Sequence, residues 1–117
     1  MGFLGSLRFR QYKKSLGTDT ITFQAEKVAK GEIVQVTSAY VTDYTTANKK
    51  LVLGIRDVAG IDHYILTVQE TLTFEAHLTG RIYLISGERL IGIVTSPSEN
   101  DECYFTADGE RYAIPGT

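Results

Sequence analysis

The stretch from residue 32 to residue 94 is a succession of short β-type segments separated by turn residues, with little room for a helix. Apolar and polar side chains alternate along it. Leu51, Leu53 and Ile55 stand against the polar Lys50, Arg56 and Asp57, and residues 71–78 show the same alternation. Because successive side chains of a strand point to opposite faces, each segment can bury one face. A single hairpin is marginal in water, so these segments must close over a shared core.

We therefore predict an all-β fold, a single antiparallel β-sandwich with jelly-roll-like connectivity and an N-terminal arm. A chain of 117 residues with 43% hydrophobic content is long enough for one domain. The regular spacing of turn residues favours a sandwich or jelly roll. The expected strands cover residues 20–24, 32–43, 50–58, 63–68, 71–78, 81–85, 89–95, 103–107 and 110–114. Gly80 and Gly109 are assigned to turns and Gly92 to a bulge.

The first fourteen residues differ from the rest of the chain in charge. They carry four basic residues and no acidic one, whereas the whole chain has a net charge of −2. We divide the chain into a basic and apolar arm, residues 1–18, and a sandwich domain, residues 19–117. The residues expected to dock the arm on a partner are Phe3, Leu4, Leu7, Arg8, Phe9, Arg10, Lys13 and Lys14.

This mixture favours protein docking, because apolar side chains can act as buried anchors while charges at the rim set the register. A nucleic-acid arm is usually richer in lysine and arginine, so we expect no nucleic acid as partner. Binding to an anionic membrane or to nucleic acid, and an ordinary first strand or helix of the domain, are the alternatives that the sequence leaves open. Helical spacing would align Phe3 or Leu4 with Leu7, while residues 7–10 alternate as a strand would.

Catalytic motifs are missing from the sequence. His63 and His77 are the only imidazoles, and neither accompanies a serine or cysteine motif that would make a nucleophile. No glycine-rich phosphate loop occurs. We expect a protein that is not an enzyme and has no small-molecule substrate and no cofactor.

Metal binding is the weaker reading of the acidic residues. His63 with Asp57 or Asp62 lacks the further ligands that zinc usually needs, and the Asp57–Asp62 spacing matches no EF-hand. The acidic loop at residues 99–102 also offers carboxylates, and the same argument against a metal site applies to it. Aspartate and glycine are ordinary loop residues, so we expect no metal site.

The sequence has neither a membrane-spanning stretch nor the pattern of a signal peptide. No apolar stretch approaches the roughly 18 residues of a membrane span, and Arg8 comes too early for the apolar region of a signal peptide. We expect a protein made in the cytoplasm of a host and no contact with a membrane. Cys103 is the single cysteine, and we expect it to be a small buried side chain rather than half of a disulfide.

Tyrosine is frequent, with seven residues and no tryptophan. Tyr40 and Tyr44 lie near the end of one expected strand and Tyr64 lies beyond the next loop. If they gather at one end of the sandwich, their rings form a possible ligand face for a sugar or a receptor. Tyrosine is also a favoured strand residue, and that structural role is the alternative.

Three segments resemble small all-β proteins encoded among the structural genes of tailed phages. They are residues 32–41 before a Thr/Asn turn, the pattern Asp57-x-x-Gly60-x-Asp62-x-Tyr64, and residues 87–90, Gly-Glu-Arg-Leu. The resemblance implies a virion component, a capsid decoration or cement protein that binds the major capsid protein. The alternative is a head-tail junction or tail-fibre component, with a junction protein as partner. With such a role we expect a homo-oligomer, a trimer or a larger ring.

Overall fold

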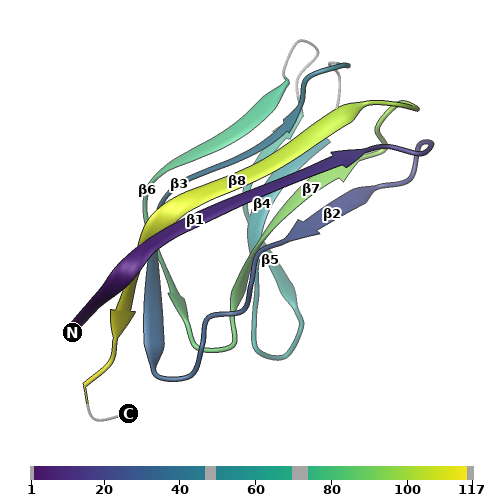
Figure 1. Cartoon of the computed structure of the whole chain (residues 1–117). Coiled ribbons are helices and arrows are strands. Elements are labelled where there is room, and N and C mark those ends of the chain that lie inside the picture. The colour runs from purple at the N-terminus through teal and green to yellow at the C-terminus, as the bar shows by residue number, and fades with distance from the viewer. Residues whose placement is uncertain (1, 47–49, 70–73, 116–117) are drawn as a thin grey trace.

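The computed structural model describes residues 2–46, 50–69 and 74–115, and within them the chain is an eight-stranded β-sandwich (Figure 1). The strands are β1 (Gly2–Lys14), β2 (Ile21–Gln24), β3 (Glu32–Asp43), β4 (Lys50–Arg56), β5 (Asp62–Gln69), β6 (Glu75–Ile85), β7 (Arg89–Thr95) and β8 (Glu102–Ala113). None of the described residues forms a helix that is long and apolar enough to cross a membrane.

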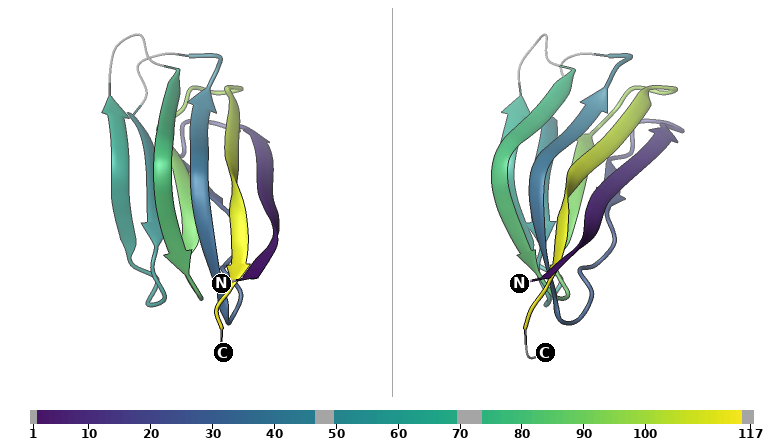
Figure 2. Two further views of the ribbon diagram at one scale, coloured as in Figure 1. Left: turned by 90° about the vertical axis from the view of Figure 1, so that its left-hand side faces the viewer. Right: turned by 60° about the vertical axis from the view of Figure 1, so that its left-hand side comes forward.

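The two sheets have four strands each, and all their pairings are antiparallel. Sheet A has the order β1-β8-β3-β6 and sheet B the order β2-β7-β4-β5. The pairs β1·β8, β2·β7, β3·β6 and β4·β5 are nested, as in one long hairpin rolled up so that its strand pairs alternate between the sheets. This arrangement is a jelly roll, so the predicted fold class is confirmed. Figure 2 shows sheet A with β1 at its edge.

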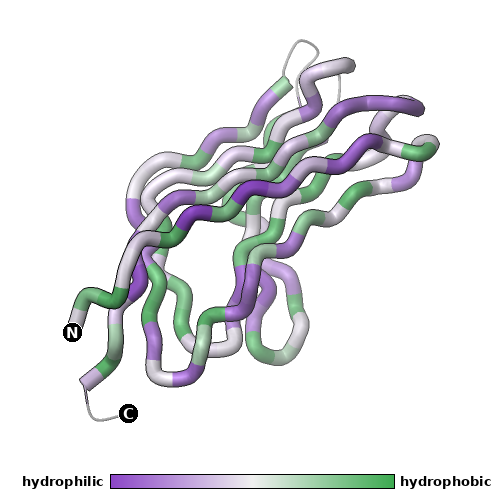
Figure 3. Tube along the Cα trace, viewed as in Figure 1, coloured by the Kyte–Doolittle hydropathy of each residue, from purple (hydrophilic) through white to green (hydrophobic). Residues whose placement is uncertain are grey.

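The core lies between the sheets and is built around Phe105 of β8. Its ring stacks on Phe23 of β2, with ring centroids 5.9 Å apart, and meets the ring of Phe9 edge-on at 5.4 Å. Aliphatic side chains from both sheets surround this group, and Cys103 lies among them as expected. The alternation of hydropathy that buries one face of each strand can be followed along the chain in Figure 3.

Residues 2–14, which the sequence analysis set apart as an arm, form the edge strand β1. The strand pairs with β8 from Gly2 opposite Ala113 to Lys14 opposite Glu102. Leu7 and Phe9 point inward and pack on the core. The segment is therefore part of the sandwich, and of the conformations that the sequence left open the strand is the one found. Its role in docking stays a prediction.

Two glycines that were predicted to mark turns lie inside continuous strands instead. Gly80 is within β6, opposite the irregularity between Val36 and Ser38 of β3, and has a φ of 118°. Gly109 is within β8, where a Cβ atom would come 2.1 Å from the carbonyl oxygen of Gln35. Glycine is needed at these positions for backbone freedom and for the close approach of two strands, not for chain reversal.

The bulge predicted at Gly92 is also wrong. Strand β7 pairs in unbroken register with both of its neighbours. Glycine is required there because the ring of Phe105 occupies the place of a side chain, with its Cδ1 atom 2.7 Å from the position of a Cβ. The predicted strand 71–78 and the turn at residues 45–48 extend outside the described residues.

Candidate binding face on sheet A

The outer face of sheet A carries a groove lined by tyrosines. Register places every second residue of each strand on this face, and two adjacent rows run across the four strands. One row is Tyr12, Tyr104, Thr42 and Glu75, and the next is Arg10, Thr106, Tyr40 and His77. A cavity of about 320 Å³ lies along them. We call it the tyrosine groove, and its lining residues are Arg10, Tyr40, Thr42, Tyr44, Glu75, Tyr104 and Thr106.

The rings of the groove contact one another and leave faces open to solvent. Tyr104 lies between Tyr12, at a centroid distance of 5.0 Å, and Tyr44, at 5.6 Å. Tyr40 stacks on the imidazole of His77, with centroids 4.0 Å apart and planes 15° from parallel. Tyr44 is 61% exposed. Rings that support each other in this way offer flat apolar surfaces at fixed positions.

Charged groups border the groove. The guanidinium of Arg10 donates to the carboxylate of Asp108 at 3.0 and 3.3 Å and to the carbonyl oxygen of Phe9 at 2.8 Å. Partial burial and the nearby Glu102 carboxylate raise the pKa of the Tyr12 hydroxyl above its ordinary value. The groove thus combines apolar rings with hydroxyl groups, one cation and the Glu75 carboxylate.

Two of the three tyrosines predicted to form a ligand face meet here. Tyr40 and Tyr44 line the groove, whereas Tyr64 lies on β5 in sheet B, opposite Gly54. Sequence reasoning missed Tyr12 and Tyr104. The alternation along residues 102–108, with Tyr104 between the inward Cys103 and Phe105, shows that Tyr104 faces outward, but only the pairing with β1 shows what it faces.

Ser38, His77 and Glu75 form a series that resembles a nucleophile, a base and an orienting acid. The Oγ atom of Ser38 is 3.3 Å from Nε2 of His77, and Nδ1 of His77 is 3.7 Å from Oε1 of Glu75. The second distance is too long for the hydrogen bond that orients a catalytic base. The imidazole is also stacked on Tyr40, which occupies one of its faces. The arrangement is an exposed polar cluster of a sheet surface.

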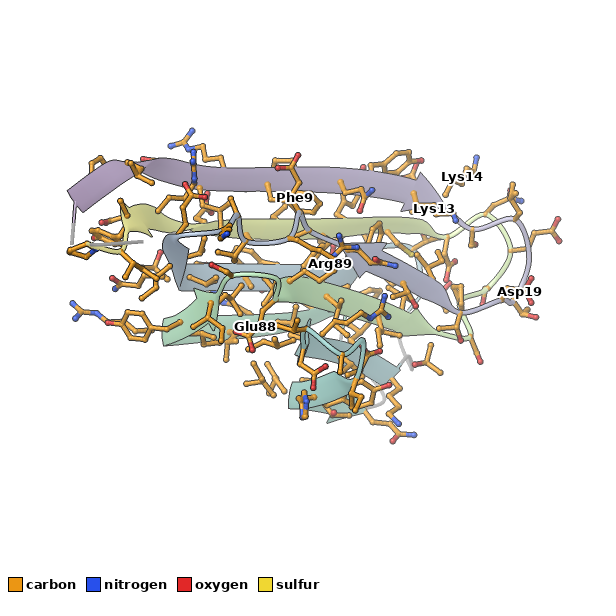
Figure 4. All side chains as sticks on the ribbon, turned by 90° about the horizontal axis from the view of Figure 1, so that it is seen from below. Phe9, Lys13, Lys14, Asp19, Glu88 and Arg89 are labelled. Atoms are coloured by element: carbon orange, nitrogen blue, oxygen red, sulfur yellow. The ribbon has the colours of Figure 1, made fainter. Side chains whose placement is uncertain are left out.

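The predicted docking residues of β1 divide between the two faces of the sheet. Leu7 and Phe9 are committed to the core, while Arg8 and Arg10 are exposed. Figure 4 shows Lys13 and Lys14 at the end of β1. Exposed apolar side chains occur at its beginning instead, at Phe3 and Leu4.

Phe3 belongs to a row of apolar side chains that crosses all of sheet A. It pairs with Tyr112 of β8, with the two rings 5.8 Å apart and edge to face. Ile33 of β3 is opposite Tyr112 on its other side and opposite Ile85 of β6. Phe3 is 60% and Ile85 54% exposed. We call these four residues the apolar row. Solvent-exposed apolar groups that are contiguous on one face are typical of an interaction surface.

A buried polar network ties three segments together at the opposite end of the strands. Asp43 at the end of β3 accepts hydrogen bonds from the amides of Thr45 and Thr46, at 3.1 and 3.2 Å. Asp101 accepts from the hydroxyl of Thr46 and the amide of Ser98, at 2.8 and 2.9 Å. Burial, followed by hydrogen bonding to Asp101, raises the pKa of Asp43 to about 6. The pair therefore holds a shared proton more readily than an exposed aspartate would.

The loop between β4 and β5 contains the residues considered as metal ligands. Asp57 accepts from the amides of Ala59 and Ile61, both at 2.9 Å, and lies 2.8 Å from Nε2 of His63. The His63 contact and these amides lower the pKa of Asp57. Asp62 pairs with Arg56 instead, at 2.7 Å. Within the described parts of the chain no three His, Cys, Asp or Glu side chains are grouped as a metal would require.

Comparisons with known proteins give likenesses of shape only. No protein-family model matches the chain and no curated protein matches its sequence, so the resemblance to tailed-phage proteins has no support at the sequence level. The core of Drosophila NLP, described in terms of pentamer formation and histone binding, is 8% identical over 90% of this chain and 97% of its own, with a TM-score of 0.45.

Two further β-rich structures show similar likenesses. A chain from infectious bursal disease virus Gt strain is 15% identical over 89% of this chain, with a TM-score of 0.38, and this chain spans 30% of its length. The CBM22-1 xylan-binding domain of Paenibacillus barcinonensis Xyn10C is 16% identical over 99% of this chain and 88% of its own, with a TM-score of 0.38. Scores this low leave the function to be argued from the residues of the chain itself.

Proposed function

We propose that the protein is a non-enzymatic structural component of a phage virion, a capsid decoration or cement protein that binds the major capsid protein through the outer face of sheet A. The observation that carries the proposal is the apolar row, Phe3, Tyr112, Ile33 and Ile85. The row is contiguous across four strands and lies at the beginning of the basic strand β1. A patch of this kind, next to charges, has the composition of an interface centre with its rim.

The apolar row and the exposed cations of β1 contribute to docking in different ways. An apolar side chain that becomes fully buried contributes about 1.5–3 kcal/mol, so the exposed members of the row can act as anchors. The exposed cations of β1 act mainly on the rate of association and on its salt dependence. The predicted anchors Leu7 and Phe9 do not take part, because they already stabilise the core.

A virion role sets the remaining expectations. The protein is made in the host cytoplasm, joins the particle without a cofactor, and assembles as a homo-oligomer, a trimer or a ring. A place at the head-tail junction or in a tail fibre, with a junction protein as partner, is the alternative within the same class.

The experiment is add-back to particles assembled without the protein, with occupancy measured by co-sedimentation. Replacing Phe3 and Ile85 by serine removes two exposed anchors, and we expect affinity to fall roughly 10- to 100-fold for each anchor that is buried on docking. Ile65→Ser is the matched control, since Ile65 is a 42% exposed aliphatic residue on β5 in sheet B. Wild-type occupancy of the double variant would exclude this face as the docking surface.

Carbohydrate or receptor binding is the second candidate, and the tyrosine groove favours it. Open tyrosine faces beside hydroxyl and carboxylate groups suit a sugar ring, which is apolar on its faces and polar at its edge. A glycan array measures this directly. Binding that is lost in Tyr44→Ala and retained in Tyr64→Ala, which changes a tyrosine on the other sheet, would support the candidate. An array without dose-dependent binding would remove it.

A further inference from the structure

The outer edge of β1 is an unpaired strand edge. β1 is the last strand of sheet A and pairs with β8 alone. Backbone groups of an antiparallel strand alternate between its two edges, so every second residue of β1 presents its amide and carbonyl away from β8. No other strand of the described chain takes these groups. The side chain of Arg10 contacts the carbonyl oxygens of Phe9 and Ala107, which lie in the β1·β8 ladder, and so does not cover this edge. Such an edge is a template for one more strand.

A cavity of about 330 Å³ opens beside this edge, between the two sheets. We call it the edge cavity. Leu7 and Arg8 of β1 line one side of it, and the connection at residues 25–29 lines the other. Its inner wall is apolar and reaches the core at Val34, Leu84 and Leu90. A strand added next to β1 would continue sheet A over this opening, so its inward-facing side chains would enter the edge cavity.

The charges around the edge select the occupant. Arg8 lies on the outer face of β1. The edge cavity is lined by the cations Arg8, Lys27 and Arg111 and by the anions Glu26 and Glu32, of which Glu32 pairs with Arg111, so its lining has a net charge of +1. A second copy of β1, paired antiparallel about Phe9, would place Arg8 of one copy opposite Arg10 of the other. Like charges directly opposite each other are destabilising, so self-pairing is disfavoured and acidic side chains are favoured.

We propose that an extended segment of a partner protein, with alternating apolar and acidic residues, adds as a strand to the free edge of β1. Its apolar side chains enter the edge cavity and its carboxylates lie beside Arg8. Backbone hydrogen bonds to β1 supply affinity, and the alternation supplies specificity. The inference rests on the proposed function, because it specifies the chemistry of the segment by which the partner protein would bind.

The probe is a synthetic, acetylated and amidated octapeptide of alternating glutamate and valine, labelled for fluorescence anisotropy and titrated into the intact protein. In a strand, residues that point to one face also direct their amides to one edge. Methylating the amides of all valines therefore blocks one edge of the peptide, and methylating those of all glutamates blocks the other. We expect one methylated peptide to bind like the parent and the other to lose affinity tenfold or more.

A charge swap tests the second part of the proposal. Arg8→Glu should weaken binding of the glutamate-valine peptide and strengthen binding of a lysine-valine peptide, while Arg81→Glu, on β6 at the far edge of sheet A, should change neither. The proposal is overturned if both methylated peptides bind equally, if no saturable binding occurs, or if sedimentation shows a dimer that Arg8→Glu alters. If the Phe3 and Ile85 variants lose particle binding but still bind the peptide, strand addition is supported although the proposed docking face is not needed for it. If they keep particle binding but the protein does not bind the peptide, strand addition is refuted and the proposed function is unaffected.

Discussion

Replacing Asp43 by asparagine should stabilise the protein at neutral pH, although it changes a fully buried residue. Asp43 is 0% exposed and its pKa is raised to about 6, against an ordinary value of 3.8. The folded state therefore binds a proton that the unfolded state has released between about pH 4 and pH 6. The stability that this proton contributes is fully present below pH 4 and is lost as the pH rises through 6.

The magnitude follows from the size of the shift. About two pKa units at roughly 1.4 kcal/mol each correspond to a loss of up to about 3 kcal/mol at pH 7.5. Asparagine at position 43 cannot ionise, and its carbonyl oxygen can still accept from the amides of Thr45 and Thr46. Its amide group can donate to Asp101. We therefore expect Asp43→Asn to match the wild type at pH 4 and to exceed it by 1–3 kcal/mol at pH 7.5.

The assay is urea unfolding followed by circular dichroism from pH 4 to pH 8 for both proteins. The difference between them is the informative quantity, because carboxylates with a lowered pKa, such as Asp57, make their contribution at higher pH and lose it on acidification. Asp19→Asn removes a carboxylate at an exposed position in the connection after β1 (Figure 4) and is the matched control. A lower stability of Asp43→Asn at pH 7.5, or a difference that does not grow with pH, would refute the reasoning.

Three further outcomes are expected. Deleting residues 2–14 removes Leu7 and Phe9 from the core, so the truncated chain should lose cooperative unfolding in a thermal melt, and a sharp transition near that of the wild type would contradict the inward packing of β1. Gly109→Ala should cost about 1–3 kcal/mol in urea unfolding, since its Cβ would overlap the carbonyl of Gln35, and a neutral effect would show that β3 and β8 separate easily. Ser38→Ala should leave the hydrolysis of a p-nitrophenyl ester unchanged, whereas a loss of hydrolysis would make Ser38 a nucleophile.

Much of the fold follows from local sequence patterns. The predicted ranges 32–43 and 89–95 coincide with β3 and β7, because long β-branched runs bounded by turn residues leave few alternatives. Glycine was the source of the errors in placing turns and bulges, since the same residue type permits a turn, a bulge or the close approach of two strands. At Gly109 and Gly92 only the neighbouring strand shows which of these applies.

The candidate site was harder to predict, because it is assembled across strands that are distant in sequence. Alternation places Tyr104 on an outer face, but its contact with Tyr12 depends on the pairing of the first strand with the last. Tyr64 was grouped with Tyr40 by proximity in sequence, and the jelly-roll order places the two on different sheets. Sheet membership is decided by the rolling of the whole chain, which no local pattern records.

The pairing of β1 with β8 also has a consequence for biosynthesis. Arg10 and its contact at Ala107 are 97 residues apart, so at a translation rate of 5–20 residues per second the first strand waits roughly 5–20 s for its partner to be made. During that interval an apolar strand with two open edges could associate with other nascent chains. The basic residues along β1 repel another copy of the same strand. The positive charge of β1 thus opposes aggregation of the nascent chain before the folded protein meets any partner.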